Sequence, residues 1–191
     1  MHINMSLMKD GKNAFCDPDS KDGLSDIAHS FIAGVMRHIK GICALTNPLV
    51  NSYKRLVPGF EAPCYIAWTS ANRSALIRVP TARGNGTRIE LRNPDPSCNP
   101  YLTFALLLSA GLEGIRENLT PPVPVQTNIY DLSEKELDQL GIESLPDSLQ
   151  AAVAEMKRDP FVKSVLGNHV YGKYVEAKEV VCQTEDWADM R

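Results

Sequence analysis

Arginine side chains are concentrated in one segment of this chain, residues 51–92. Six of the ten arginines lie there, at Arg55, Arg73, Arg78, Arg83, Arg88 and Arg92. Together with Lys54 they give seven positive charges against Glu61 and Glu90, so the segment carries +5, whereas the whole chain carries −3. Guanidinium groups form bidentate hydrogen bonds to phosphate and carboxylate groups. A basic segment in an acidic protein therefore predicts a site that binds anions.

The end of this segment alternates in the manner of a β-strand. Ile89 and Leu91 are expected to face the core. Arg88, Glu90 and Arg92 then share the opposite face. Two guanidinium groups ~6 Å apart repel by roughly 3 kcal/mol at an effective dielectric constant of ~20. A bound polyanion or metal ion would offset that repulsion, so this strand is predicted to border a ligand site.

Composition narrows the class of protein. The 191 residues are 43% hydrophobic and 23% charged, which is typical of a globular protein with a core. No stretch approaches the ~20 apolar residues of a membrane span. The five cysteines are scattered and form no CxxC pair, which argues against a disulfide framework or a zinc site. We therefore expect a cytoplasmic protein with reduced thiols and no membrane partner.

The basic segment is not predicted to bind nucleic acid. It contains few aromatic residues placed for base stacking. The chain as a whole is acidic, with a sequence pI of about 5.8.

Helical and strand patterns surround the basic segment. Ser25 is expected to cap a helix that runs to about Thr46, where Asn47-Pro48 ends it. A second helix is expected from Pro100 to about Asn118, with Asn99 as its cap. Its apolar residues cover most of its circumference, which predicts a buried helix. The strands expected between them are residues 65–69, 76–79 and 88–92, in an antiparallel sheet, with Asn85-Gly86 providing positive φ in the last turn.

The remaining chain is predicted to be mostly helical. A turn at Asp10-Gly11 separates two possible short strands, and Ser133 to Glu136 forms a capping box. Helices are expected from Pro146 to about Arg158 and over residues 160–166 and 169–180, followed by a polar tail from Cys182. The fold class is therefore α+β, with antiparallel strands flanked by helices and a helical C-terminal region.

Several long motifs resemble the glutamine synthetase family, type I, in its bacterial-like form. They are residues 1–6 (MHINMS), 47–63 (NPLVNSYKRLVPGFEAP), 72–74 (NRS), 77–80 (IRVP), 88–92 (RIELR) and 95–102 (DPSCNPYL). Their order and spacing make the resemblance specific, and it extends from residue 1 to about residue 180. The resemblance implies that residues 1–191 are the C-terminal portion of the family's catalytic domain, part of its catalytic barrel.

The family joins ammonia to L-glutamate through a γ-glutamyl phosphate formed from ATP. The resemblance makes His2 and Glu90 ligands of a Mg²⁺ or Mn²⁺ ion beside the ATP phosphates. Arg55 and Arg92 match positions that hold the substrate glutamate. Glu61 matches the glutamate of a flap, which also contacts the substrate, shields the acyl phosphate from water and helps to take a proton from ammonium.

The remaining matched positions concern ATP. Arg73 and Arg78 match residues on the ATP phosphates and on the phosphoryl group in transfer, and Arg73 therefore counts as catalytic as well. Arg88 joins them, while Asn4, Met5 and Ser6 match a segment that contacts the nucleotide. Clustered arginines suit this task because they stabilise charge that moves during phosphoryl transfer.

The resemblance also implies what this sequence lacks. The family's small N-terminal domain and the first half of its catalytic domain would precede Met1, and they supply most metal-binding glutamates. We therefore expect the isolated chain to be inactive, whereas full-length members assemble as homo-oligomers of twelve subunits. Tyr130 aligns with a tyrosine that some bacterial members adenylylate, but Gln126-Thr127 replaces the usual upstream pair of charges, which argues against that modification.

Two further interpretations remain open from the sequence. A ligase of the same superfamily that joins glutamate to polyamines or other amines would carry the same arginines. A non-catalytic fragment that assembles with full-length subunits would also fit a chain without the N-terminal half.

Overall fold

A computed structural model of the chain describes residues 1–60, 62–70 and 72–186. The sheet strands are β1 (Ile3–Met5), β4 (Tyr65–Thr69), β5 (Ala75–Arg78) and β6 (Ile89–Leu91), and a hairpin is formed by β2 (Met8–Lys9) and β3 (Lys12–Asn13). The helices are α1 (Asp26–Thr46), α2 (Val50–Tyr53), α3 (Pro100–Arg116), α4 (Glu134–Gln139), α5 (Leu149–Arg158) and α6 (Pro160–Asp186), with 3-10 turns η1 (Gly84–Gly86) and η2 (Ile129–Asp131). The α+β class predicted from the sequence is confirmed.

The four sheet strands are ordered β1-β6-β5-β4. β6 pairs antiparallel with both β1 and β5, as expected, but β4 and β5 are parallel, so the prediction of a wholly antiparallel sheet is wrong. Five residues, 70–74, separate these two strands, far fewer than the dozen or more of a usual parallel crossover. Tertiary contacts fasten this connection, because the Asn72 side chain donates a hydrogen bond of 2.8 Å to the carbonyl oxygen of Thr127.

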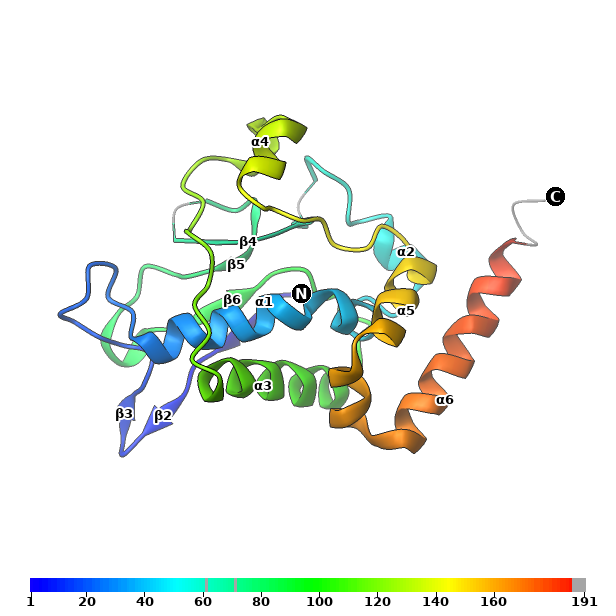
Figure 1. Ribbon diagram of the computed structural model, residues 1–191, viewed down its shortest axis with the longest axis horizontal. Helices are drawn as coiled ribbons and strands as arrows, with labels where there is room; N and C mark the ends of the chain where they lie inside the picture. The colour runs from blue at the N-terminus through cyan, green and yellow to red at the C-terminus, as the bar shows by residue number, and fades with distance from the viewer. Residues whose placement is uncertain (61, 71, 187–191) are drawn as a thin grey trace.

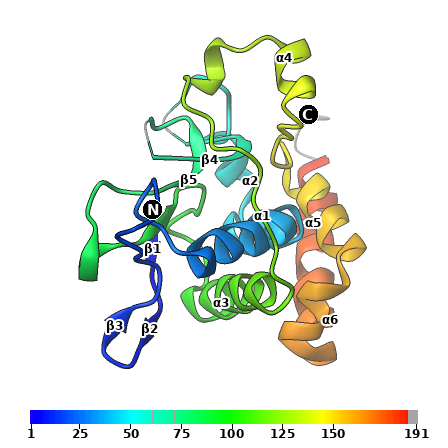
Figure 2. The same ribbon diagram turned by 60° about the vertical axis from the view of Figure 1, so that its left-hand side comes forward.

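Helices α1 and α3 pack on one face of this sheet. Figure 1 shows them side by side, and Figure 2 shows the sheet on one side of the pair and α5 and α6 on the other. Their caps follow the sequence predictions: the Ser25 hydroxyl accepts from Ala28 N–H, and the Asn99 side chain accepts from Tyr101 N–H. The two helices approach closely at glycines, where a Cβ on Gly34 would overlap the carbonyl oxygen of Ala110.

Burial of α3 is less complete than the sequence predicts. Its inner face, including Leu106, Leu107 and Ala110, is fully buried against α1. The outer face carries large apolar side chains that are exposed by the fractions Tyr101 85%, Phe104 52%, Leu108 46% and Leu112 40%. The expectation of a helix buried all round is therefore wrong, because packing within the described residues covers only one face.

Loop predictions hold in part. The Asp10-Gly11 turn does connect two short strands, with both residues at positive φ. Between β5 and β6, however, the positive φ belongs to Gly84 and not to Asn85 or Gly86, and the segment forms the 3-10 turn η1. The Arg83 guanidinium supports this loop by donating to the carbonyl oxygens of Asp22 and Pro80.

The C-terminal third is helical, as expected. The Ser133–Glu136 capping box is present at α4. α5 begins at Leu149 and not at Pro146, because the Ser148 hydroxyl caps it by accepting from Ala151 N–H. α6 is interrupted at Gly167, which has φ 74°, so the two predicted helices exist as its two parts. The second part continues beyond the expected end at residue 180 to Asp186, and so includes the start of the polar tail from Cys182.

No helix in the described part of the chain is long and apolar enough to cross a membrane. All five cysteines are free thiols.

Candidate active site

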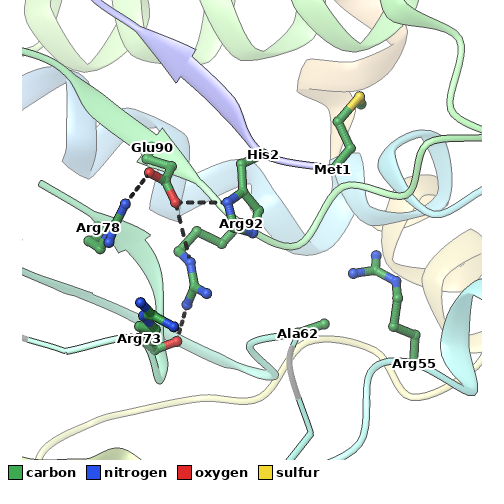
Figure 3. Close-up of a pocket in the computed structure, with 8 residues that line it drawn as sticks. All are labelled: Met1, His2, Arg55, Ala62, Arg73, Arg78, Glu90 and Arg92. Atoms are coloured by element: carbon green, nitrogen blue, oxygen red, sulfur yellow. Dashed lines mark hydrogen bonds and ion pairs between the residues drawn. The ribbon is translucent and has the colours of Figure 1, made fainter. Parts of the chain in front are cut away.

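A cavity of about 350 Å³ lies on the charged face of the sheet (Figure 3). Its described lining residues are Met1, His2, Arg55, Ala62, Arg73, Arg78, Glu90 and Arg92. Strand β6 positions this face as the alternation predicts, because Ile89 and Leu91 are fully buried in the hydrophobic core while Glu90 turns toward the cavity. Register brings further residues beside it, since Glu90 pairs with Arg78 of β5 and Asn4 of β1.

Glu90 is the centre of the charged contacts in the cavity. Its Oε2 accepts a hydrogen bond of 2.6 Å from Arg78 Nη2. Its Oε1 lies 2.9 Å from His2 Nδ1 and 3.4 Å from Arg92 Nε. Glu90 is only 4% exposed, and its Oε1 makes these two contacts without a well-directed hydrogen bond. One oxygen of a buried carboxylate is thus available to a cation.

The His2 and Glu90 pair fits two neighbouring ligands of a divalent cation. Neighbouring ligand atoms around a six-coordinate Mg²⁺ with ~2.1 Å bonds are about 3 Å apart, and Nδ1 and Oε1 are 2.9 Å apart. Burial first, and then the positive charges of Arg92, the N-terminus and Arg78, lower the pKa of His2 against the opposing effect of Glu90. A neutral imidazole is the form that binds metals. The described residues contain no group of three or more His, Cys, Asp or Glu side chains suited to a metal ion.

Positive charge outnumbers negative charge among the described lining residues. Four guanidinium groups face one carboxylate, that of Glu90. Arg92 is almost fully buried, and its Nη1 donates to the carbonyl oxygen of Arg73. Burial, followed by the nearby charges of Arg78 and Arg73, lowers the pKa of Arg92, and Glu90 opposes this effect. An anionic ligand would relieve the excess charge.

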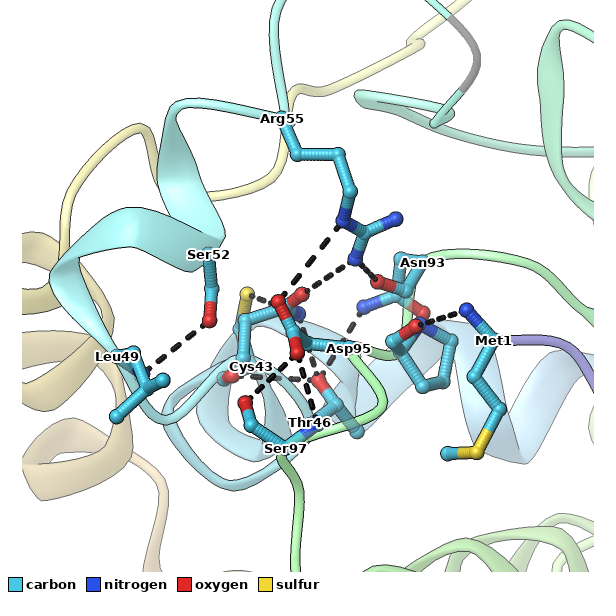
Figure 4. A network of polar contacts seen from close by, with 11 residues as sticks. Met1, Cys43, Thr46, Leu49, Ser52, Arg55, Asn93, Asp95 and Ser97 are labelled. Atoms are coloured by element: carbon cyan, nitrogen blue, oxygen red, sulfur yellow. Dashed lines mark hydrogen bonds and ion pairs between the residues drawn. The ribbon is translucent and has the colours of Figure 1, made fainter.

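Arg55 lies across the cavity from the Glu90 cluster (Figure 3). A cage of polar groups holds its guanidinium (Figure 4). Arg55 Nη2 donates 3.1 Å to Asn47 Oδ1 and 2.6 Å to the carbonyl oxygen of Asn93, and Nε lies 4.0 Å from Asp95 Oδ2. Asn47 and Asn93 are fully buried. The guanidinium is therefore fixed in direction before any ligand arrives.

The sequence interpretation did not identify this cage. Asn47 follows the last residue of α1, and Asn93 and Asp95 follow β6, so each sits where a regular element ends beside a proline. Burial acts to raise the pKa of Asp95, but hydrogen bonds from Ser97 and Ser52 and the charge of Arg55 outweigh it and lower the pKa. The Asn-Pro pairs were recognisable as breaks in structure, but nothing in them indicated that they converge on one arginine.

Four of the predicted nucleotide contacts lie outside the cavity lining. Asn4, Met5 and Ser6 line a neighbouring cavity of about 370 Å³ with apolar residues of α1 and α3. Arg88 Nε donates 3.0 Å to Asn4 Oδ1, and its Nη1 donates to the carbonyl oxygen of Gly86. Arg88 is thus next to the β1 segment but does not reach the Glu90 cluster.

Two other predictions concern the loop that borders the cavity. The predicted flap residue Glu61 lies outside the described residues. Its neighbour Ala62 lines the cavity, and the hydroxyl of Tyr130 donates 3.3 Å to the Ala62 carbonyl oxygen. Tyr130 is half-buried beside Tyr65, with ring centroids 5.9 Å apart, so it packs as a support for this loop.

Comparison with known proteins identifies the family. Residues 1–188 match the family model described as "Glutamine synthetase, catalytic domain". The glutamine synthetase of Clostridium saccharobutylicum is 58% identical over 191 residues, which are 100% of this chain and 42% of the relative. That of Methanosarcina mazei is 58% identical over 94% of this chain and 40% of the relative, and that of Thermotoga maritima 52% identical over 99% and 42%.

Solved structures agree with the sequence comparison. A structure titled "Apo GmaS without ligand" has a TM-score of 0.81 and 34% identity over 99% of this chain and 41% of its own. A GmaS complex with ADP has a TM-score of 0.82 and 34% identity, and it is matched over 99% and 42% of the two chains. The chain spans about two fifths of the length of each relative. It belongs to the glutamine synthetase family and corresponds to the C-terminal portion of the catalytic domain.

Proposed function

We propose that this chain supplies part of an active site that joins ammonia to L-glutamate at the expense of ATP. The observation that carries the proposal is the cavity in which Glu90 and His2 meet Arg73, Arg78 and Arg92, with Arg55 opposite them. The relatives described above are named glutamine synthetases, which supports ammonia as the acceptor in place of another amine.

The substrate glutamate would be held between the two sides of this cavity. Arg55 keeps Nη2 on its protein partners and Nε near Asp95, so its other terminal nitrogen, Nη1, would hydrogen-bond a carboxylate. Arg92 lies on the opposite side and is buried, which strengthens its attraction to an anion. Two fixed guanidinium groups would therefore orient the substrate so that its side-chain carboxylate faces the phosphate donor.

The phosphate groups of ATP would lie near Arg73 and Arg78. Charge spreads over the oxygens of the phosphoryl group during its transfer, and preorganised guanidinium groups stabilise that charge. His2 and Glu90 would hold Mg²⁺ or Mn²⁺, which supplies charge neutralisation on the phosphates when bound. Arg88, whose Nε donates 3.0 Å to Asn4 Oδ1, and the Asn4–Ser6 segment would contact the remainder of the nucleotide.

Glu61 completes the proposal on the strength of the sequence resemblance. As a flap carboxylate it would take a proton from bound ammonium, which frees the nitrogen lone pair for attack on the acyl phosphate. It would also exclude water from that intermediate. Ala62, its neighbour in the sequence, lines the cavity, which supports the proposal.

The chain is proposed to act only together with further polypeptide. Divalent cations of this kind need more oxygen ligands than His2 and Glu90 provide. The relatives contain more than twice this length, so the missing ligands would come from their unmatched portion. We place the reaction in the cytoplasm, with the assembled enzyme in the family's twelve-subunit form, and the free cysteines suit that reducing compartment.

Formation of γ-glutamyl hydroxamate from glutamate, hydroxylamine and Mg²⁺- or Mn²⁺-ATP tests the proposal. The chain is assayed alone and after co-expression with the unmatched, preceding portion of the Clostridium saccharobutylicum enzyme. Activity is expected only in the combination, and Arg73→Gln should abolish it. A confirmed complex without activity would contradict the proposed function, and activity of the pure chain would contradict its dependence on a second polypeptide.

A further inference from the structure

The polar groups that hold Arg55 are themselves tied to Thr46, the last residue of α1 (Figure 4). Asn47 Nδ2 donates 2.9 Å to Thr46 Oγ1, and Asn93 Nδ2 donates 3.2 Å to the same oxygen. The N–H group of Asp95 donates 2.8 Å to the carbonyl oxygen of Thr46. The supports of Arg55 therefore converge on one threonine, which is fully buried and lies outside the described lining of the cavity.

The hydroxyl group of Thr46 has no hydrogen-bonding capacity left over. Its Oγ1 donates 3.2 Å to the carbonyl oxygen of Cys43 in the same helix, and it accepts from the two amides. A hydroxyl group has one hydrogen to donate and two lone pairs that accept. Asn47 and Asn93 are fully buried as well, so bulk water cannot take the place of these hydrogen bonds.

This hydroxyl decides which end of the Asn47 amide faces Arg55. Because the Thr46 hydrogen is directed to Cys43, Oγ1 accepts from the amide, and Asn47 turns its Nδ2 toward it. The amide oxygen Oδ1 then faces Arg55, whose Nη2 donates 3.1 Å to it. The reverse orientation would set amide hydrogens against a guanidinium group, which has donors and no acceptor.

A second route leads from the same hydroxyl to Arg55. The Asn93 side chain is bonded to Thr46, and the Asn93 carbonyl oxygen accepts 2.6 Å from Arg55 Nη2. Arg78, on the other side of the cavity, is held instead by Glu90 (Figure 3). A change at Thr46 should therefore reach Arg55 and leave the phosphate side of the site unaltered.

We propose that Thr46 is a positioning residue for the substrate glutamate, because its hydroxyl orients the Asn47 and Asn93 groups that direct the Arg55 guanidinium. The proposal rests on the proposed function, which assigns a carboxylate of glutamate to Arg55. Without the hydroxyl, Arg55 keeps its charge and loses its fixed direction, so its hydrogen bond to a carboxylate is poorly aligned. Binding of glutamate weakens, while ATP is bound as before.

Nuclear magnetic resonance of the chain alone tests the positioning without relying on activity. The guanidinium nitrogen signals of Arg55 are assigned by their loss in Arg55→Lys. Hydrogen bonds restrict rotation of the guanidinium and should keep its Nη1 and Nη2 signals separate. Thr46→Val replaces the hydroxyl by a methyl group of similar size and should merge or broaden them, whereas Thr46→Ser keeps the hydroxyl and should preserve them.

Thr103→Val is the matched control for Thr46→Val. Thr103 of α3 is also fully buried, but its hydroxyl has no hydrogen-bond partner among the described residues. The same chemical change at this position should therefore leave the Arg55 signals unaltered.

Hydroxamate kinetics measure the consequence for the substrate, with each variant co-expressed with the preceding portion of the Clostridium saccharobutylicum enzyme. Thr46→Val is expected to raise KM for glutamate by about tenfold, the effect of about one hydrogen bond, and to keep KM for ATP within about twofold. Thr46→Ser and Thr103→Val should leave both constants near those of the unaltered chain. A loss of stability alone would lower the amount of active enzyme and would not separate the two KM values.

Unchanged Arg55 signals in Thr46→Val would overturn the proposal, as would an unchanged KM for glutamate or an equal rise of both KM values in an active combination. Circular dichroism shows whether each variant is folded. If Thr46→Val does not fold, the serine variant decides: loss of the Arg55 signals there would overturn the proposal, and their retention supports it. If the unaltered combination forms no hydroxamate, the proposed function fails, and the Arg55 signals alone decide the positioning.

Discussion

At the scale of single residues, Glu90 is the charge on which the cavity depends. It contacts His2, Arg78 and Arg92, and it is buried, so replacing it removes the counter-charge of two guanidinium groups at once. We expect Glu90→Gln to lower the free energy of unfolding by about 2–4 kcal/mol, because breaking a buried pair leaves charge uncompensated. Urea unfolding monitored by circular dichroism measures this change.

Glu143→Gln is the matched control for Glu90→Gln. Glu143 pairs with Lys40 at 2.8 Å, but its side chain is 69% exposed. A solvent-exposed pair contributes about 0–1 kcal/mol, so the control should unfold almost as the unaltered chain does. Equal losses in the two variants would show that Glu90 has no special role in the cavity.

Asp95 gives a second prediction at this scale, one that depends on pH. Its pKa in the folded chain lies below the ordinary value of 3.8. Such a group stabilises the fold fully above its unfolded pKa, and this contribution disappears as pH falls through the folded pKa. Asp95→Asn should therefore be about 1–2 kcal/mol less stable than the unaltered chain at neutral pH. The difference between the two proteins should shrink below pH 3.8.

Urea unfolding of both proteins at neutral pH and near the acid limit of the fold measures this difference. If the difference in the free energy of unfolding is the same at every pH, the charge of Asp95 does not contribute to stability and only the shape of its side chain matters.

At the scale of elements, the contact between α1 and α3 fixes the layer behind the site. Gly34 and Gly114 face each other there, and a methyl group on Gly34 would overlap the backbone of α3. Because backbone cannot yield as a flexible side chain does, Gly34→Ala should cost about 3 kcal/mol or more, near the upper end for overpacking. Gly172 of α6 has nothing within 4 Å of an added Cβ, so Gly172→Ala should stabilise by about 0.5–1 kcal/mol. Thermal unfolding of the two variants compares them, and a mild effect at Gly34 would contradict the close helix contact.

The sequence predicted these elements well where the signal is local. Ser25, Asn99 and the Ser133–Glu136 box lie at helix starts in the structure as their types require. The alternation of Ile89, Glu90 and Leu91 likewise assigned the faces of β6. Strand pairing was harder to predict, because the parallel β4–β5 pair depends on tertiary contacts of Asn72 with a segment more than 50 residues away. Apolar content alone also could not distinguish a helix buried within the chain from α3, whose outer face remains exposed.

The residues of the candidate site were likewise predictable only in part. Family motifs assign His2, Arg55, Arg73, Arg78, Glu90 and Arg92 to one site, and all six line one cavity in the structure, while their individual roles stay predictions. The cage around Arg55 could not be anticipated, because Asn47, Asn93 and Asp95 come from two segments that only the packed fold brings together. Residues that belong to a family motif can be identified in a sequence. Residues that position them, such as the cage around Arg55, are identified only from the structure.

At the scale of the whole molecule, the C-terminal helix is linked to the site through the end of α1. Tyr174 of α6 donates 2.8 Å from its hydroxyl to the carbonyl oxygen of Ala44, and Lys178 Nζ donates 2.7 Å to that of Pro48. These two acceptors flank Asn47, which holds Arg55. Figure 1 shows α6 at the side of the molecule beyond α5, so this link crosses from the outermost helix to the cavity wall.

Loss of the Tyr174–Ala44 hydrogen bond should increase the mobility of residues 44–48 at the cavity wall, although Tyr174 does not line the cavity. Tyr174→Phe removes the hydroxyl and leaves the ring, so it should cost about 1 kcal/mol of stability and raise hydrogen exchange of residues 44–48. Tyr171→Phe is the control, because Tyr171 lies on the same helix and its ring is 5.9 Å from Lys163 Nζ. Hydrogen exchange measured by mass spectrometry compares the two. Faster exchange around Asn47 in the first variant alone would establish that α6 steadies the support of Arg55. Equal exchange in both variants would mean that α6 covers the core without influencing the site.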